Sequence, residues 1–101
     1  MAKFNEEFVY NIYSIIEEIP EGKVTTYGDL AKLAGYEKNS RLVGRALSLS
    51  EMYGNYPCHR VVNSSGKLAE DFANQRELLI RENITFKNNG NVDLEKHRWR
   101  I

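Results

Sequence analysis

Residues 25–49, TTYGDLAKLAGYEKNSRLVGRALSL, decide the fold of this chain. Either Thr25 or Thr26 can cap a short helix over Tyr27–Leu33. Asp29 lies three residues after Thr26, close to the spacing of a capping box, in which the two residues satisfy free backbone amides at the start of a helix. The stretch is therefore predicted to open with a short, well-delimited helix.

A second helix is predicted in the same stretch. The pair Ala34-Gly35 ends the first helix, and Asn39 or Ser40 can cap a helix over Arg41–Leu49. The apolar side of this helix carries Leu42, Val43, Ala46 and Leu47. Two short helices joined by a glycine-containing turn indicate a helix-turn-helix, here a variant with a longer turn. The spacing leaves open a plain helical hairpin that binds nothing.

The remainder of the chain is expected to complete one domain over residues 1–101. The expected elements outside residues 25–49 are a helix over 4–19, a short buried run at 61–62, a helix over 71–82 and a hairpin formed by 84–86 and 92–94. Trp99 is expected to pack the C-terminal end against the rest of the domain. The predicted fold class is mainly α with a small β-hairpin.

Composition is that of an ordinary globular domain. Of 101 residues, 42% are hydrophobic and 28% are charged, and no stretch approaches the roughly 20 apolar residues of a membrane-spanning helix. The first seven residues lack the basic-then-apolar pattern of a secretion signal. We therefore expect a cytoplasmic protein with no membrane association.

Charge is unevenly distributed along the chain. The formal net charge is zero, which by itself disfavours a nucleic-acid partner. Residues 23–60 nevertheless hold six lysines and arginines against three acidic residues, a surplus of three, whereas acidic residues gather near the start. This distribution is compatible with one basic, DNA-binding face, although a solvated surface of mixed charge remains an alternative.

The stretch Pro57-Cys58-His59-Arg60-Val61-Val62 is the most informative for chemistry. A single cysteine forms no internal disulfide, and His59 and His97 lack zinc-ligand spacing, so we expect no metal. Cys58 is then either a buried small hydrophobic residue or a reactive thiol. A neighbouring histidine can activate a thiol, but adjacent residues of an extended chain point apart, so His59 would need a turn or a bridging water.

The stretch Pro57–Val62 resembles the active-site signature of the methylated-DNA–protein-cysteine methyltransferases, which repair 6-O-alkylguanine. Three further blocks are similar to this family at matching spacing: Ile19–Ala31, Ser40–Leu47 and Leu78–Glu82. The resemblance covers nearly the whole chain. It implies the winged-helix-like helix-turn-helix domain of the C-terminal alkyltransferase type, acting as a monomer without a cofactor.

The resemblance also implies roles for individual residues. Cys58 would accept the alkyl group, His59 would act through a water as its base, Glu82 would orient His59, and Tyr27 would contact the flipped base or a phosphate. Arg41 would enter the minor groove of double-stranded DNA and fill the gap left by the extruded alkylguanine. The expected DNA contacts are Tyr27, Thr26, Arg41, Gly44, Arg45 and Arg60. The expected pocket residues are Leu47, Pro57 and Val61.

Two departures from the family pattern leave an alternative open. The family's hinge asparagine corresponds to Ser50, and the loop over 66–72 lacks the glycines that shape the alkyl pocket of the repair enzymes. The short length and the tail are more similar to the alkyltransferase-like proteins, which flag alkylguanine for nucleotide excision repair proteins and usually lack the cysteine. This sequence keeps Cys58, so stoichiometric transfer, lesion binding without transfer and plain DNA binding remain three hypotheses.

Overall fold

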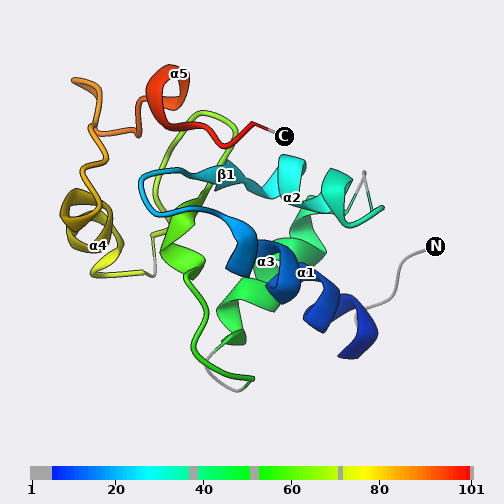
Figure 1. Cartoon of the computed structure of the whole chain (residues 1–101). Coiled ribbons are helices and arrows are strands. Elements are labelled where there is room, and N and C mark those ends of the chain that lie inside the picture. Colours follow the sequence, from blue (N-terminus) through cyan, green and yellow to red (C-terminus); the bar gives the residue numbers. More distant parts are fainter. Residues whose placement is uncertain (1–5, 37–38, 51–52, 71, 101) are drawn as a thin grey trace.

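The structure, a computed structural model, describes residues 6–36, 39–50, 53–70 and 72–100. Its elements in chain order are α1 (Glu6–Glu18), β1 (Thr25–Thr26), α2 (Tyr27–Leu33), α3 (Ser40–Ser48), the 3-10 turn η2 (Cys58–Arg60), β2 (Val61–Val62), α4 (Gln75–Arg81) and α5 (Leu94–His97). Helices α1, α2 and α3 pack together, and α4 and α5 lie on the other side of β1 (Figure 1). No helix in the described part is long and apolar enough to cross a membrane.

Helix α1 supplies the main part of the core. Phe8, Ile12 and Ile16 recur at helical spacing and are at most 1% exposed. Burying each such side chain stabilises the fold by about 1.5–3 kcal/mol relative to exposure. The helix was expected over 4–19; positions 4 and 5 lie outside the described residues, and the helix ends at Glu18, one residue earlier than expected.

The helix-turn-helix forms as predicted. Helix α2 has the expected bounds, and the Thr26 hydroxyl accepts a hydrogen bond from the Asp29 amide at 3.1 Å, which identifies Thr26 as the cap. Helix α3 begins at Ser40, one residue earlier than expected, after Asn39. Val43 of α3 is fully buried among the side chains of the main core cluster. The outer face of α3 is left to carry polar residues and glycine.

The regular sheet differs from the one expected. Strands β1 and β2 pair in parallel, with Thr25 opposite Val61. The predicted hairpin is reduced to one antiparallel bridge between Phe86 and Val92, and Leu94 belongs to α5 rather than to a strand. The parallel pair joins segments far apart in sequence, so no local turn signal announces it.

The C-terminal segment runs alongside the start of the helix-turn-helix. The amide of Val24 donates to the His97 carbonyl at 2.9 Å, and the amide of Trp99 donates to the Val24 carbonyl at 2.7 Å. Arg98 forms a bidentate ion pair with Asp29 of α2, at 2.9 and 2.8 Å. These contacts confirm that the segment around Trp99 holds the C-terminal end against the domain.

Helix α4 is shorter than predicted but ends in a well-defined motif. It starts at Gln75 rather than 71, a position outside the described residues. Beyond its last residue, Asn83 adopts a left-handed backbone with φ of 65°. The amide of Asn83 donates to the Ile80 carbonyl and that of Ile84 to the Leu79 carbonyl, the two bonds of a Schellman motif. This ending places Glu82 at the helix cap.

Candidate functional site

A single turn of 3-10 helix, η2, carries the residues expected to do chemistry. Pro57 precedes the turn, and its carbonyl accepts a hydrogen bond from the Arg60 amide at 3.1 Å. With three residues per turn, successive side chains of a 3-10 helix point about 120° apart. Cys58, His59 and Arg60 therefore leave the backbone in three directions.

His59 and Arg60 converge on one carboxylate, that of Glu82. The Nε2 atom of His59 lies 2.5 Å from Glu82 Oε2. Arg60 donates from Nε to Oε1 at 2.9 Å and from Nη2 to Oε2 at 3.0 Å, while its Nη1 donates to the Ile19 carbonyl at 2.8 Å. Because Glu82 takes Nε2, Nδ1 is the other ring nitrogen of His59.

The environment of Glu82 keeps this carboxylate charged. Its side chain is only 8% exposed. Burial raises the pKa of Glu82, but hydrogen bonds from Arg60, His59 and the amide of Gly22 outweigh burial, so the pKa lies below its usual 4.5. An ionised Glu82 holds the His59 ring by its Nε2 atom, the geometry in which a carboxylate orients a histidine.

The thiol of Cys58 is buried and yet borders a cavity. The residue is 6% exposed and belongs to the main core cluster. Burial raises the pKa of the Cys58 thiol above its usual 9.0, and a side-chain hydrogen bond with Ser50 opposes this rise in part. The thiol is therefore protonated at neutral pH, and a nucleophilic role requires a nearby proton acceptor.

A cleft of about 720 Å³ opens beside this thiol. Tyr27, Cys58 and His59 all line it, which brings together side chains from α2 and η2. The three expected pocket residues, Leu47, Pro57 and Val61, also line the cleft. Residues before and within α4 line it as well: the apolar Ala69, Phe72, Ala73 and Leu78, and the polar Asn74 and Gln75.

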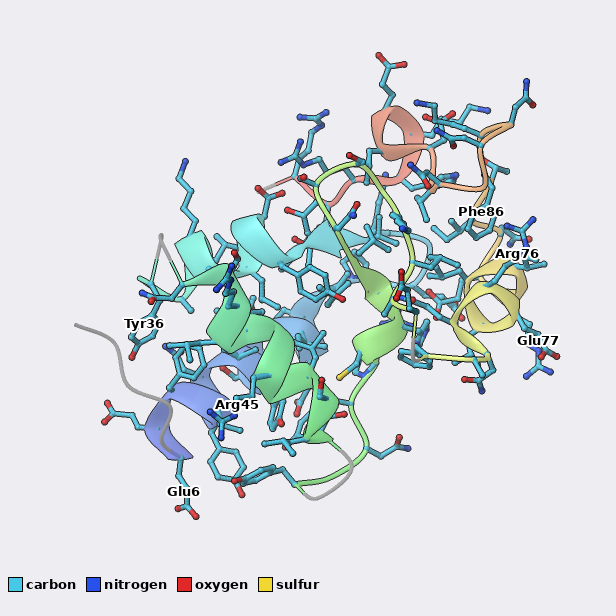
Figure 2. All side chains as sticks on the ribbon, turned by 180° about the vertical axis from the view of Figure 1, so that it is seen from behind. Glu6, Tyr36, Arg45, Arg76, Glu77 and Phe86 are labelled. Carbon is cyan, nitrogen blue, oxygen red and sulfur yellow. The ribbon has the colours of Figure 1, made fainter. Side chains whose placement is uncertain are left out.

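Helix α3 presents the expected DNA-contacting side chains. Arg41 and Arg45 are exposed, and Gly44, between them, lines the cleft. Figure 2 shows Arg45 on α3, away from Arg76, which lies 4.3 Å from the Phe86 ring at the end of the molecule that carries α4. Helix α3 thus carries both the exposed arginines and a residue that lines the cleft.

Two expected DNA contacts have structural roles instead. Thr26 is 3% exposed, and its hydroxyl is used to cap α2. The guanidinium of Arg60 is turned inward to Glu82 and Ile19. Both were expected to contact DNA, and both make hydrogen bonds within the protein in this structure.

Among the described residues of the middle segment, the basic side chains are not gathered on one face. Arg60 is turned inward, and Lys32 lines a separate, shallower cleft of about 450 Å³ together with Asp29, Arg98 and Arg100. The surplus of charge counted along the sequence is therefore spread over separate parts of the described structure. Of the arginines expected to contact DNA, Arg41 and Arg45 are exposed on α3.

Gln75 is a residue of the cleft that the sequence reasoning missed. It is 1% exposed, and its side chain makes hydrogen bonds to the backbone of Ala69, His59 and Val61. A glutamine within an amphipathic helical pattern carries no local sign of burial, so only the fold identifies it. In the described part of the chain, no group of three or more histidine, cysteine, aspartate or glutamate side chains could hold a metal ion.

Together, the fold and the cleft define a helix-turn-helix protein whose second helix borders a cleft with a buried thiol. A histidine that contacts a glutamate lines the same cleft. The chain belongs to the family of 6-O-methylguanine DNA methyltransferase DNA-binding domains, whose model matches residues 7–84.

Three comparisons describe its place in this family. It is 39% identical over 97 residues to the DNA base-flipping protein of Escherichia coli strain K12, covering 93% of this chain and 75% of that protein. It is 40% identical over 68 residues to the methylated-DNA–protein-cysteine methyltransferase of Methanosarcina acetivorans, covering 67% of this chain and 44% of that one. The crystal structure of S. pombe Atl1 with damaged DNA containing O6-carboxymethylguanine matches all of both chains, with a TM-score of 0.85 and 28% identity.

Proposed function

We propose that this protein extrudes a 6-O-alkylated guanine from duplex DNA into the cleft and that Cys58 accepts the alkyl group. One observation carries the proposal: Cys58, His59 and Tyr27 line the same cleft, and the Nε2 atom of His59 contacts a charged Glu82. The reactive carbon of such a lesion is stacked inside the duplex, so the base must leave the helix before a sulfur can approach.

Helix α3 is proposed to dock in the minor groove. Gly44 has no heavy atom within 4 Å of the place where a Cβ would be, so the absence of a side chain there leaves room for close approach to DNA. Arg41 lies exposed in the first turn of α3. Its side chain would enter the space that the extruded base leaves, which offsets the unstacking cost of a few kcal/mol.

The transfer step needs only residues of this chain and one water molecule. The Cys58 proton passes to Nδ1 of His59, through a water, and Glu82 stabilises the imidazolium. The sulfur–carbon bond forms as the bond between the carbon and guanine O6 breaks. A hydrogen bond from the Tyr27 hydroxyl stabilises the departing guanine, which takes up the proton that Cys58 gave to His59. The product is a stable thioether, so each molecule acts once and consumes no cofactor.

A second candidate function is lesion binding without transfer, which would flag alkylguanine for nucleotide excision repair proteins. Two observations favour it: the match to Atl1 extends over the whole of both chains, and burial raises the pKa of the Cys58 thiol. In that case the cleft would hold the flipped base, and Cys58 would be part of its wall.

Mass spectrometry of the intact protein decides between the two. Because the chain has one cysteine, incubation with duplex DNA containing 6-O-methylguanine should replace the thiol hydrogen of the wild type by a methyl group, a net mass gain of one CH2, and should leave the mass of Cys58→Ala unchanged. Lesion-selective binding with no added mass would reject transfer and support the second candidate. Equal affinity for damaged and undamaged duplex would reject both.

Base extrusion is tested separately with Arg41→Ala. This variant should lose lesion affinity, because the extruded base loses its replacement in the stack. Arg81→Ala is the matched control, since Arg81 is also exposed but lies on α4 and pairs with Glu77. Unchanged lesion binding by Arg41→Ala would contradict the minor-groove docking.

A further inference from the structure

The amide side chain of Gln75 joins two walls of the cleft. Its Oε1 accepts a hydrogen bond from the Ala69 amide at 2.8 Å. Its Nε2 donates to the carbonyls of His59 at 3.1 Å and Val61 at 2.9 Å. Three of the four hydrogen bonds available to an amide are thus used, all of them to backbone. The partners also define its orientation, since an amide nitrogen must face the carbonyls and an oxygen must face the N–H.

These three partners belong to different functional parts. Ala69 lies in the loop before α4, and Ala69, Phe72 and Leu78 line the cleft together with Cys58. The His59 carbonyl belongs to η2, which carries Cys58, and the Val61 carbonyl belongs to β2, which follows η2. A single buried side chain therefore joins the cleft wall at Ala69 to the backbone of η2 and β2.

We infer that Gln75 is a positioning residue that sets the size of alkyl group the cleft accepts, by holding the Ala69 loop against the segment that carries Cys58 and His59. The inference rests on the proposed function, because it assigns the alkyl group to this wall. Without the bond to Ala69, the loop is free to move outward, and a bulky group gains room that a methyl group cannot use.

Two substitutions separate the bond to Ala69 from the bonds to the carbonyls. Gln75→Met keeps the volume and removes all three hydrogen bonds. Gln75→Glu keeps an oxygen that accepts from the Ala69 amide in either protonation state, but it places a second oxygen against the His59 and Val61 carbonyls. Gln75→Glu should therefore be the less stable of the two, although it retains the restraint on the loop.

The readout is the ratio of affinities for duplexes carrying 6-O-benzylguanine and 6-O-methylguanine, measured by fluorescence anisotropy. Every protein carries Cys58→Ala, so that binding is measured without transfer. The ratio is insensitive to the fraction of folded protein, because both affinities fall together when protein unfolds. Urea unfolding of the same proteins gives the order of stability.

Gln75→Met should shift the ratio toward the benzyl lesion by about tenfold, the scale on which an apolar pocket discriminates small changes in fit. Gln75→Glu should keep the parental ratio despite its lower stability. The control Glu77→Gln, exposed on the same helix, should change neither quantity. A role in stability alone predicts an unchanged ratio in both Gln75 variants and would overturn the inference, as would a shift in Gln75→Glu equal to that in Gln75→Met.

The failure of this inference is distinguishable from the failure of the proposed function. If the parental protein prefers alkylated duplex and the ratio is the same in all variants, the proposed function stands and the role of Gln75 is refuted. If the parental protein binds damaged and undamaged duplex equally, the proposed function and the inference are both overturned.

Discussion

Replacing Arg60 with methionine should destabilise the fold while leaving the exposed arginines of α3 in place. Methionine retains most of the aliphatic stem and removes the guanidinium. Glu82 then keeps only the hydrogen bonds from His59 and the Gly22 amide, and the Ile19 carbonyl loses the donor that lies 2.8 Å away. A residue that only contacted DNA would have no such effect on the free protein.

The exposure of the pair sets the magnitude. The side chains of Arg60 and Glu82 are 16% and 8% exposed, so the pair is largely buried. Removing one partner of a buried ion pair costs about 3–5 kcal/mol, and the lower end applies because His59 still faces the carboxylate. A domain of this size is stable by about 5–15 kcal/mol, so the loss should appear as a clear decrease in the urea midpoint with an unchanged slope.

The chain offers a matched control in the pair Arg81–Glu77. Its nitrogen–oxygen distance is 2.8 Å against 2.9 Å for the Arg60–Glu82 pair, but its side chains are 69% and 64% exposed. Arg81→Met should therefore cost no more than about 0.5 kcal/mol, as exposed helical pairs do. If the two methionine variants lose the same stability, the reasoning that buries Arg60 in a structural cluster is refuted.

Four further predictions follow from the geometry. Gly66→Ala should cost about 3 kcal/mol, because its Cβ would lie 2.5 Å from a backbone carbonyl at φ +84°, whereas Gly35→Ala, at φ +85° with open space around it, should cost about 1 kcal/mol in thermal unfolding. Thr26→Ala should cost about 1 kcal/mol by loss of the α2 cap, measured in urea; no loss would contradict the cap. Folding lowers the pKa of Glu82, so its charged form stabilises the folded protein above pH 4.5, and this stabilisation should be lost as the pH falls below that value. Glu82→Gln should therefore weaken the dependence of the urea midpoint on pH in the acid range. The rate at which iodoacetamide alkylates Cys58 should keep rising with pH above pH 9, because burial raises the thiol pKa; a rate that levels off at lower pH would contradict this.

Local signals explain the part of the fold that was predictable. Both ends of helix α2 were predicted correctly because their signals are local. Thr26 caps its first turn, and Gly35 lies just beyond its last residue. Helix α3 and the described part of α1 follow from apolar periodicity in the same way. The candidate site was accessible differently: chemistry alone left Cys58 undecided between core and nucleophile, and the pairing of His59 with Glu82 came only from the resemblance to a family.

Tertiary structure decided which polar groups meet, because those partners are far apart in sequence. In the sequence, Arg60 is one of several arginines in a basic segment, and only the fold places a carboxylate from 22 residues away within 2.9 Å of it. In the sequence, Gln75 is an ordinary helical glutamine, and only the fold brings the backbone of Ala69 and of Val61 within hydrogen-bond distance of its side chain. Helix caps and periodicity depend on neighbouring residues and can be read along the chain, whereas buried hydrogen-bond partners depend on how separate segments pack, and that packing exists only in the folded protein.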